Sequence, residues 1–318
     1  MIELLIENQN KIYQPIVEDG IVWETQRKNT PGKLTFTVVK DDIISFQEVN
    51  PVRLKIDDKE VFYGFVFKKG RDKEHNIKVT AYDQLRYLKN KDTYVYKNKT
   101  ASDLVKMIAA DFNLKVGTIE DTGFIISSRV EDNAALFDMI GNALDLTLTN
   151  KKTMYVLYDD FGSLTLKSLA NMKTNVLISE ETGENFDYTS SIDEQTYNKV
   201  KLSYENKETG KREIYIAQDS SNINSWGVLQ HFETIDEKVN GQAKADALLN
   251  LYNAKTRNLK IKKAFGHLSV RAGSMVVVLL NLGDIEVGNY FLVETCKHTF
   301  NNDEHFMDLT LRGGEFIE

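Results

Sequence analysis

The chain has 318 residues, of which 42% are hydrophobic and 27% are charged, and its formal net charge is −7. A chain of this length can bury more than one core, and two or three domains are expected. No apolar run approaches the roughly 18 residues of a membrane helix, no N-terminal stretch has the pattern of a secretory signal, and the lone Cys296 excludes an internal disulfide. Composition therefore predicts a protein that folds in a reducing cytoplasm, without membrane insertion.

Charge is unevenly distributed along the chain. Residues 1–97 carry a net charge of +2, residues 98–190 carry −6 and residues 191–318 carry −3. A protein that holds duplex DNA through its phosphates would need a basic stripe, and the sequence contains none. We therefore expect no specific nucleic-acid binding.

The first third of the chain has the pattern of β-strands. In residues 34–39 side chains alternate between two faces at period two. A charged turn at 57–59 separates two further strands, and Gly64 in the second of them predicts a bulge or a close backbone approach. We expect residues 1–97 to form a first small β-barrel from strands at 3–7, 21–23, 34–39, 52–56, 61–67 and 77–82.

Helical patterns follow a change of composition near Lys97. Thr100 and Asp103 have the spacing of a capping box, in which two side chains satisfy backbone N–H groups at a helix start. A second helix is expected to begin at Asp132 and to present apolar residues at helical spacing as far as Leu144. An α+β module over residues 98–190 is completed by strands at 154–158 and 163–167, a turn at 159–162 and an acidic linker at 180–187.

The last third combines strands with one helix. A hairpin is expected from strands at 198–204 and 213–217, and a helix at about 236–253. Residues 275–280 are continuously apolar, which predicts a strand buried on both faces, before a Gly-Asp break at 283–284. We expect residues 191–318 to form a second β-barrel with the helix inserted. The predicted fold is mainly β, with two small barrels and a helix-containing α+β module between them.

Local sequences near both ends of the chain carry a family resemblance. They are His267-Leu-Ser-Val-Arg-Ala-Gly273, Gly288-Asn-Tyr-Phe-Leu-Val293, Cys296-Lys-His298-Thr-Phe300, His305-Phe-Met-Asp-Leu-Thr-Leu-Arg312 and the hairpin from Leu54 to Val66. In this order they resemble phage baseplate hub proteins of the XkdQ/YqbQ type, which are related to the late control protein D group. That family usually has an acidic residue where this chain has Ser274, at a turn position that accepts either.

The resemblance implies a tail-tube-like fold for both barrels and a structural role. Hub proteins of this family join the tail tube to the spike and to other baseplate proteins. We therefore expect a homotrimer with those partners, in a phage tail or a contractile tail-like particle. The chain would be found in the bacterial cytoplasm during assembly and then in the baseplate of the virion or particle. If residues 1–97 and 191–318 are barrels of one kind, three chains would place six similar barrels around a channel.

The residues that could carry chemistry are dispersed along the sequence. The five histidines lack the spacing of a zinc motif, although His298 and His305 bracket a predicted hairpin and are expected to approach each other in a structural role. Cys296 is expected to be a buried, inert thiol. Paired carboxylates at 41–42, 57–58, 159–160 and 180–181 fall in predicted turns or linkers and are expected to be solvated. No catalytic, cofactor-binding or metal-binding residue is predicted, and we expect no enzymatic activity.

Two other functional classes have to be weighed against the hub. The stretch from Thr100 to Leu144 resembles small peptidoglycan-binding modules of the LysM type, and a cell-wall hydrolase is a further class of tail protein. Exposed aromatic side chains would favour the binding module, but Phe112 and Phe137 lie on predicted apolar helix faces and are expected in the core.

Overall fold

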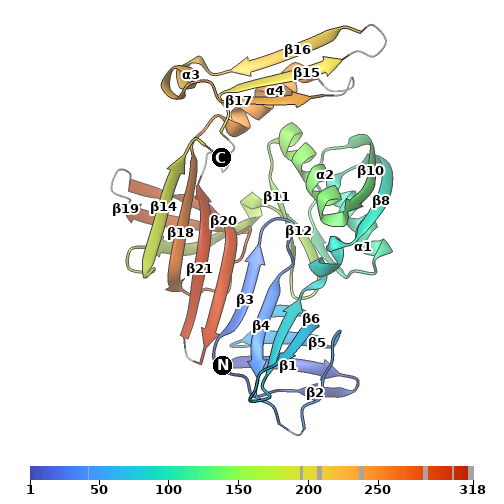
Figure 1. Ribbon diagram of the computed structural model, residues 1–318, viewed down its shortest axis with the longest axis vertical. Coiled ribbons are helices and arrows are strands. Elements are labelled where there is room, and N and C mark those ends of the chain that lie inside the picture. The colour runs from blue at the N-terminus through green and yellow to red at the C-terminus, as the bar shows by residue number, and fades with distance from the viewer. Residues whose placement is uncertain are drawn as a thin grey trace.

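The computed structural model describes residues 1–41, 43–193, 196–205, 210–235, 240–281, 286–302 and 304–313. The fold is mainly β, as predicted, and one large sheet runs through most of the molecule (Figure 1). None of the described helices is long and apolar enough to cross a bilayer.

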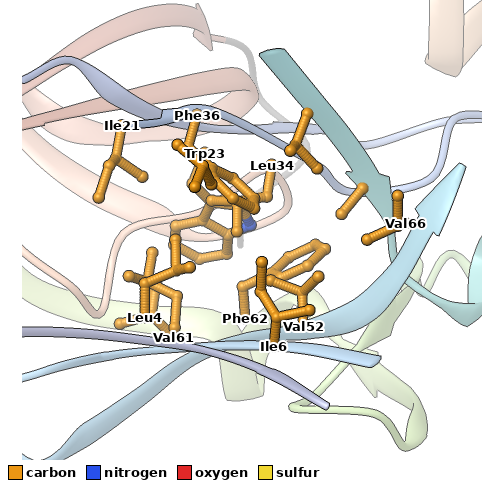
Figure 2. Close-up of a cluster of buried hydrophobic side chains, with 14 of the residues drawn as sticks. Leu4, Ile6, Ile21, Trp23, Leu34, Phe36, Val52, Val61, Phe62 and Val66 are labelled. Carbon is orange, nitrogen blue, oxygen red and sulfur yellow. The ribbon is translucent and has the colours of Figure 1, made fainter. Parts of the chain in front are cut away.

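Seven strands from the N-terminal part of the chain form the first strand group. Its strands are β1 (Ile2–Asn8), β2 (Lys11–Tyr13), β3 (Ile21–Gln26), β4 (Lys33–Val38), β5 (Pro51–Ile56), β6 (Lys59–Arg71) and β7 (Ile77–Tyr82). They are hydrogen-bonded in the order β2-β1-β5-β6-β7-β4-β3. Alternate side chains point inward and meet in one apolar core, with Trp23 and Phe36 facing Leu4 and Phe62 (Figure 2). The strand predictions for this region are confirmed.

Gly64 allows β6 to pass close to β7. A Cβ atom at this position would clash with the backbone oxygen of Tyr82 and with the ring of Phe62. Of the two possibilities that the sequence left open, the close backbone approach is the correct one, because the register shifts of β6 lie elsewhere.

The second strand group is built from the C-terminal part of the chain together with two earlier strands. It contains β13 (Lys173–Ser179), β14 (Asn185–Ser191), β18 (Thr256–Phe265), β19 (Met275–Asn281), β20 (Glu286–Asn301) and β21 (Glu304–Gly313), in the order β13-β19-β20-β21-β18-β14. The expected acidic linker at 180–187 is wrong in its second half, because residues 185–187 pair with β18. The expectation that 275–280 is buried on both faces is also wrong, since Leu279 is 47% exposed.

The two strand groups share one pairing scheme. The order β1-β5-β6-β7-β4-β3 corresponds strand for strand to β13-β19-β20-β21-β18-β14. In each group one long strand changes neighbours at a single residue, Phe65 in β6 and Leu292 in β20, and a register shift follows just beyond it. The first pair of each order differs in direction, because β1 runs antiparallel to β5 whereas β13 runs parallel to β19. Among the described residues the pairings close neither group into a barrel.

The two groups are joined edge to edge. Strand β20 pairs antiparallel with β3, from Thr295 opposite Gln26 to Phe300 opposite Ile21. Strands from the two ends of the chain therefore lie side by side in one continuous sheet (Figure 1).

The middle unit packs two helices against small sheets. Its elements are η1 (Gln84–Lys89), β8 (Lys91–Lys99), α1 (Ala101–Asp111), β9 (Val116–Ile119), β10 (Ile126–Ala135), α2 (Leu136–Lys151), β11 (Tyr155–Asp159), β12 (Leu164–Ser168) and η2 (Leu169–Met172). The capping box of Thr100 and Asp103 is confirmed. The second helix begins at Leu136 and not at Asp132, because Ala134 and Ala135 still pair with β8.

Residues between β14 and β18 form a separate insert. It contains β15 (Lys199–Glu205), β16 (Arg212–Gln218), α3 (Ser220–Trp226), β17 (Gln230–Thr234) and α4 (Gly241–Tyr252). The predicted hairpin and helix are present, but β15 and β16 form their own sheet with β17 and do not join the large sheet. The start of the predicted helix, at 236–239, lies outside the described residues, as does the Gly-Asp break at 283–284.

Candidate functional site

Arg271 lies where the two strand groups meet the middle unit. Its Nη1 donates a 2.8 Å hydrogen bond to the backbone oxygen of Asp159 in β11. The guanidinium group stacks over the ring of Tyr158 at 4.2 Å and lies 5.7 Å from the ring of Trp23 in β3. One side chain in the β18–β19 loop thus contacts the first strand group and the middle unit, which makes it a structural anchor.

Two buried carboxyl groups accompany Arg271. Asp83 is 3% exposed and accepts hydrogen bonds from the backbone N–H groups of Gly32 and Leu85. Asp159 is 5% exposed and accepts one from Gly162 at 2.6 Å. The expectation that Asp159 is a solvated turn residue is wrong, because the junction covers it.

Burial controls the protonation of this pair. Burial raises the pKa of Asp83 well above its usual value, the charge of Asp159 raises it further, and Arg271 opposes both effects. Burial also raises the pKa of Asp159, against the hydrogen bond from Gly162. Oδ2 of Asp159 has no hydrogen-bond partner among the described residues. Two neighbouring carboxyl groups in a covered site disfavour the state in which both are charged.

A histidine cluster lies beside the same junction, on β20 and β21. Nδ1 of His298 is 2.8 Å from Nε2 of His305, and Nε2 of His298 is 2.8 Å from the backbone oxygen of Val270. The ring of His298 stacks on Trp23 with centroids 4.8 Å apart. The predicted approach of the two histidines is confirmed.

The histidine cluster has the properties of packed core residues. Burial lowers the pKa of His298 to about 3 and that of His305 to about 4, with repulsion from a neighbouring histidine as the second cause in each. Cys296 is buried, as predicted, and burial raises the pKa of its thiol, which opposes formation of a nucleophilic thiolate. Among the described residues no three His, Cys, Asp or Glu side chains are grouped as metal ligands would be.

The other candidate residues lie apart from this junction. Asp41, Asp57, Glu180 and Glu181 are exposed in turns, as expected, and Asp42 lies outside the described residues. Phe137 is 8% exposed and Phe112 packs against the core of the middle unit, which confirms the expectation that both are core residues.

A hollow of about 600 Å³ crosses the seam between the two strand groups. Across it, Asp308, Lys297, Glu24 and Lys33 follow one another on strands β21, β20, β3 and β4. Lys297 is 3.4 Å from Asp308, and Lys33 forms an ion pair with Glu24. Charges therefore alternate along this row of the joined sheet, which the sequence did not reveal because Lys297 and Glu24, whose pairing joins the two ion pairs, lie more than 250 residues apart.

Comparison with known proteins identifies the family. The model of the family described as YQBQ-like matches residues 21–312. The chain belongs to the YqbQ-like family.

Two relatives from Bacillus subtilis (strain 168) match almost the whole chain. Uncharacterized protein YqbQ is 31% identical and phage-like element PBSX protein XkdQ is 30% identical, and each alignment covers 97% of this chain and 96% of the relative. Solved structures share the fold at lower identity. The prophage MuSo2 43 kDa tail protein from Shewanella oneidensis has a TM-score of 0.72 at 13% identity, over 99% of this chain and 100% of the other. Prophage tail protein gp18 from Listeria monocytogenes EGD-e has 0.63 at 13% identity, over 98% and 95%.

This YqbQ-like chain also exposes large apolar side chains on both strand groups. In the first group Ile16 is 71% exposed, Ile43 80% and Val49 69%, and in the second group Phe265 is 65% exposed. Contiguous apolar patches mark surfaces that are covered on assembly, whereas apolar residues exposed singly are normal on a protein surface.

Proposed function

We propose that this chain is a structural hub protein of a phage tail or contractile tail-like particle. The observation that supports it is the repeated strand order of the two groups and their joining through β3 and β20. The XkdQ relative is a protein of a phage-like element, and the two similar structures are tail proteins. No catalytic role is proposed for any residue.

In this proposal each strand group is a barrel-like unit of the tail-tube type. The sequence alone places the boundaries of the middle unit at residues 98 and 190, whereas the strand pairings favour a first unit that ends with β7 and a middle unit that ends with η2. The strand pairings favour assigning β13 and β14 to the second barrel unit and treating residues 196–255 as its insert. These boundaries remain a proposal.

A homotrimer follows from matching of symmetry. A sixfold ring of tube subunits can meet a threefold hub without mismatch only if each hub chain offers two equivalent surfaces. Three copies of this chain would offer six strand groups, with tube, spike and other baseplate proteins as partners. The row of alternating charges around Lys297 and Glu24 would then suit the wall of a water-filled passage.

Two measurements test this function. In a host whose particles contain this chain, deletion of its gene should leave tail tubes without a complete baseplate, and the wild-type gene should restore whole particles. Normal, infective or killing-competent particles from the deletion strain would refute the hub. The mass of the purified chain, measured by light scattering across a range of concentrations, should approach three copies. A chain that remains a single copy in the assembled particle would refute the trimer.

A further inference from the structure

Among the strand edges that have no partner in the described part of the chain are those of β14 and of the second half of β6. Strand β14 is the last in the pairing order and is bonded only to β18. The second half of β6 is hydrogen-bonded to β7 on one side. On its other side Val66 bonds to Val49 and Asn50, and no further strand is paired there. Open edges of this kind pair readily with another chain.

The internal junction shows how such edges fit together. In the common pairing scheme β20 corresponds to β6, and β3 corresponds to β14. The correspondence between β6 and β20 extends to individual backbone hydrogen bonds. Val66 exchanges backbone bonds with Val49 and Asn50 at 2.7 and 2.9 Å, and Val293 exchanges them with Gly273 and Ser274 at 2.8 and 2.9 Å. The β6 edge therefore has the geometry that β20 offers to β3.

We infer that β6 of one copy pairs antiparallel with β14 of a second copy, in the register that joins β20 to β3. The inference rests on the proposed trimer and names the edges that form it. Because Lys297 lies opposite Glu24, the equivalent Gly70 lies opposite Thr189 of the neighbouring copy. Each chain has one free β6 edge and one free β14 edge, so the contact is head to tail, and in the proposed trimer the threefold axis closes it into a ring.

The side chains on the two edges are compatible. Arg71 comes opposite Tyr188, as His298 comes opposite Trp23, and a guanidinium group can stack on a phenol ring. The hydroxyl of Tyr188 is buried and has no hydrogen-bond partner among the described residues. In the same register Lys68 comes opposite Ser191, and Asp187, the one charged residue of β14, lies beyond Arg71 at the end of the contact.

A second hydrogen bond of the internal junction also has a counterpart in the inferred contact between copies. At the internal junction the backbone N–H of Ala272 donates to Oγ1 of Thr25 at 2.9 Å. The corresponding residues are Glu48, one position before Val49, and Ser190, the neighbour of Thr189. The hydroxyl of Ser190 can therefore accept a hydrogen bond from the N–H of Glu48 in the next copy.

Disulfide trapping tests the register. Paired strands place opposite Cα atoms about 4.5–5.5 Å apart, within the range that a disulfide spans. Gly70 has open space around the site of a Cβ atom, so the G70C/T189C double variant should fold. Under mild oxidation it should form covalent dimers and trimers. The matched control, G70C/S190C, places the second thiol on the opposite face of β14 and should give at least tenfold less product.

The outcomes separate this inference from the trimer itself. Covalent trimer from G70C/T189C, with little from G70C/S190C, supports the β6–β14 contact. A wild-type chain that is trimeric by light scattering while neither variant cross-links would overturn the contact and leave the trimer standing. Equal cross-linking of both variants would overturn the register. A chain that is monomeric at every concentration and in the particle would overturn both proposals.

Discussion

Val49 and Gly273 occupy the same place in the two strand groups, and both have a left-handed backbone. Their φ angles are 72° and 92°. Each donates its N–H to the long strand of its own group, Val49 to Val66 and Gly273 to Val293. Glycine adopts this conformation at no steric cost, whereas a β-branched residue is strained there. The backbone is thus unstrained at Gly273 in the second strand group and strained at the equivalent Val49 in the first.

The V49G substitution should therefore stabilise the protein. The side chain of Val49 is 69% exposed, so little packing is lost, and release of the left-handed strain is worth about 1 kcal/mol. Urea unfolding should show a higher midpoint with an unchanged slope. The reverse change, G273V, should destabilise the protein, because its Cβ would clash with Val156 as well as bring strain. A lower midpoint for V49G would contradict the backbone strain assigned to Val49.

Gly64 and Gly70, both in β6, allow a matched test of close packing. G64A places a methyl group against the backbone oxygen of Tyr82 and should cost about 1–3 kcal/mol or more, since backbone cannot move aside easily. G70A meets no atom within 4 Å and should change stability by less than about 0.5 kcal/mol. Chemical denaturation of the two variants beside the wild type decides this, and equal effects would refute the close approach.

Much of this fold could be predicted because alternation at period two reports directly which face of a strand is buried. Strand β14 was missed because most of its side chains are exposed, so it has no such alternation. Its place is decided by pairing with β18. The burial of Asp159 was missed because it depends on Arg271, far along the chain. Even the equivalence of Val49 and Gly273 leaves no signal in residue type. Local pattern predicts elements, whereas long-range contacts decide the junction.

The D83N substitution should change how stability depends on pH. A carboxyl group whose folded pKa is raised contributes stability below its unfolded value, near 3.8, and loses it as pH rises toward the folded pKa. The amide that replaces the carboxyl group cannot ionise, so this loss should be absent from the variant. The free energy of unfolding of D83N, relative to the wild type, should increase as pH rises from about 4 to 7.

An amide side chain cannot reproduce both hydrogen bonds that Asp83 accepts from Gly32 and Leu85. The test is therefore how the difference in free energy of unfolding between D83N and the wild type changes with pH. An absolute loss at every pH is therefore compatible with the prediction. D58N, which alters an exposed residue of the β5–β6 turn, should follow the wild-type curve. If the difference between D83N and the wild type stays constant between pH 4 and 7, Asp83 is not held protonated by its surroundings.

The buried His298 should make the protein sensitive to acid in the opposite sense. Its pKa falls from 6.5 to about 3 on folding, so the unfolded chain binds a proton below pH 6.5 that the folded chain does not. Stability should be level above this pH and should fall below it by about 1.4 kcal/mol per pH unit for this group. H298F keeps an aromatic ring against Trp23 but loses the bond to Val270. It should be less stable at pH 7.5 and have a shallower slope between pH 6.5 and 4. H75N, in an exposed turn, should keep the wild-type slope, and an H298F slope equal to that of the wild type would show that His298 is not the group responsible.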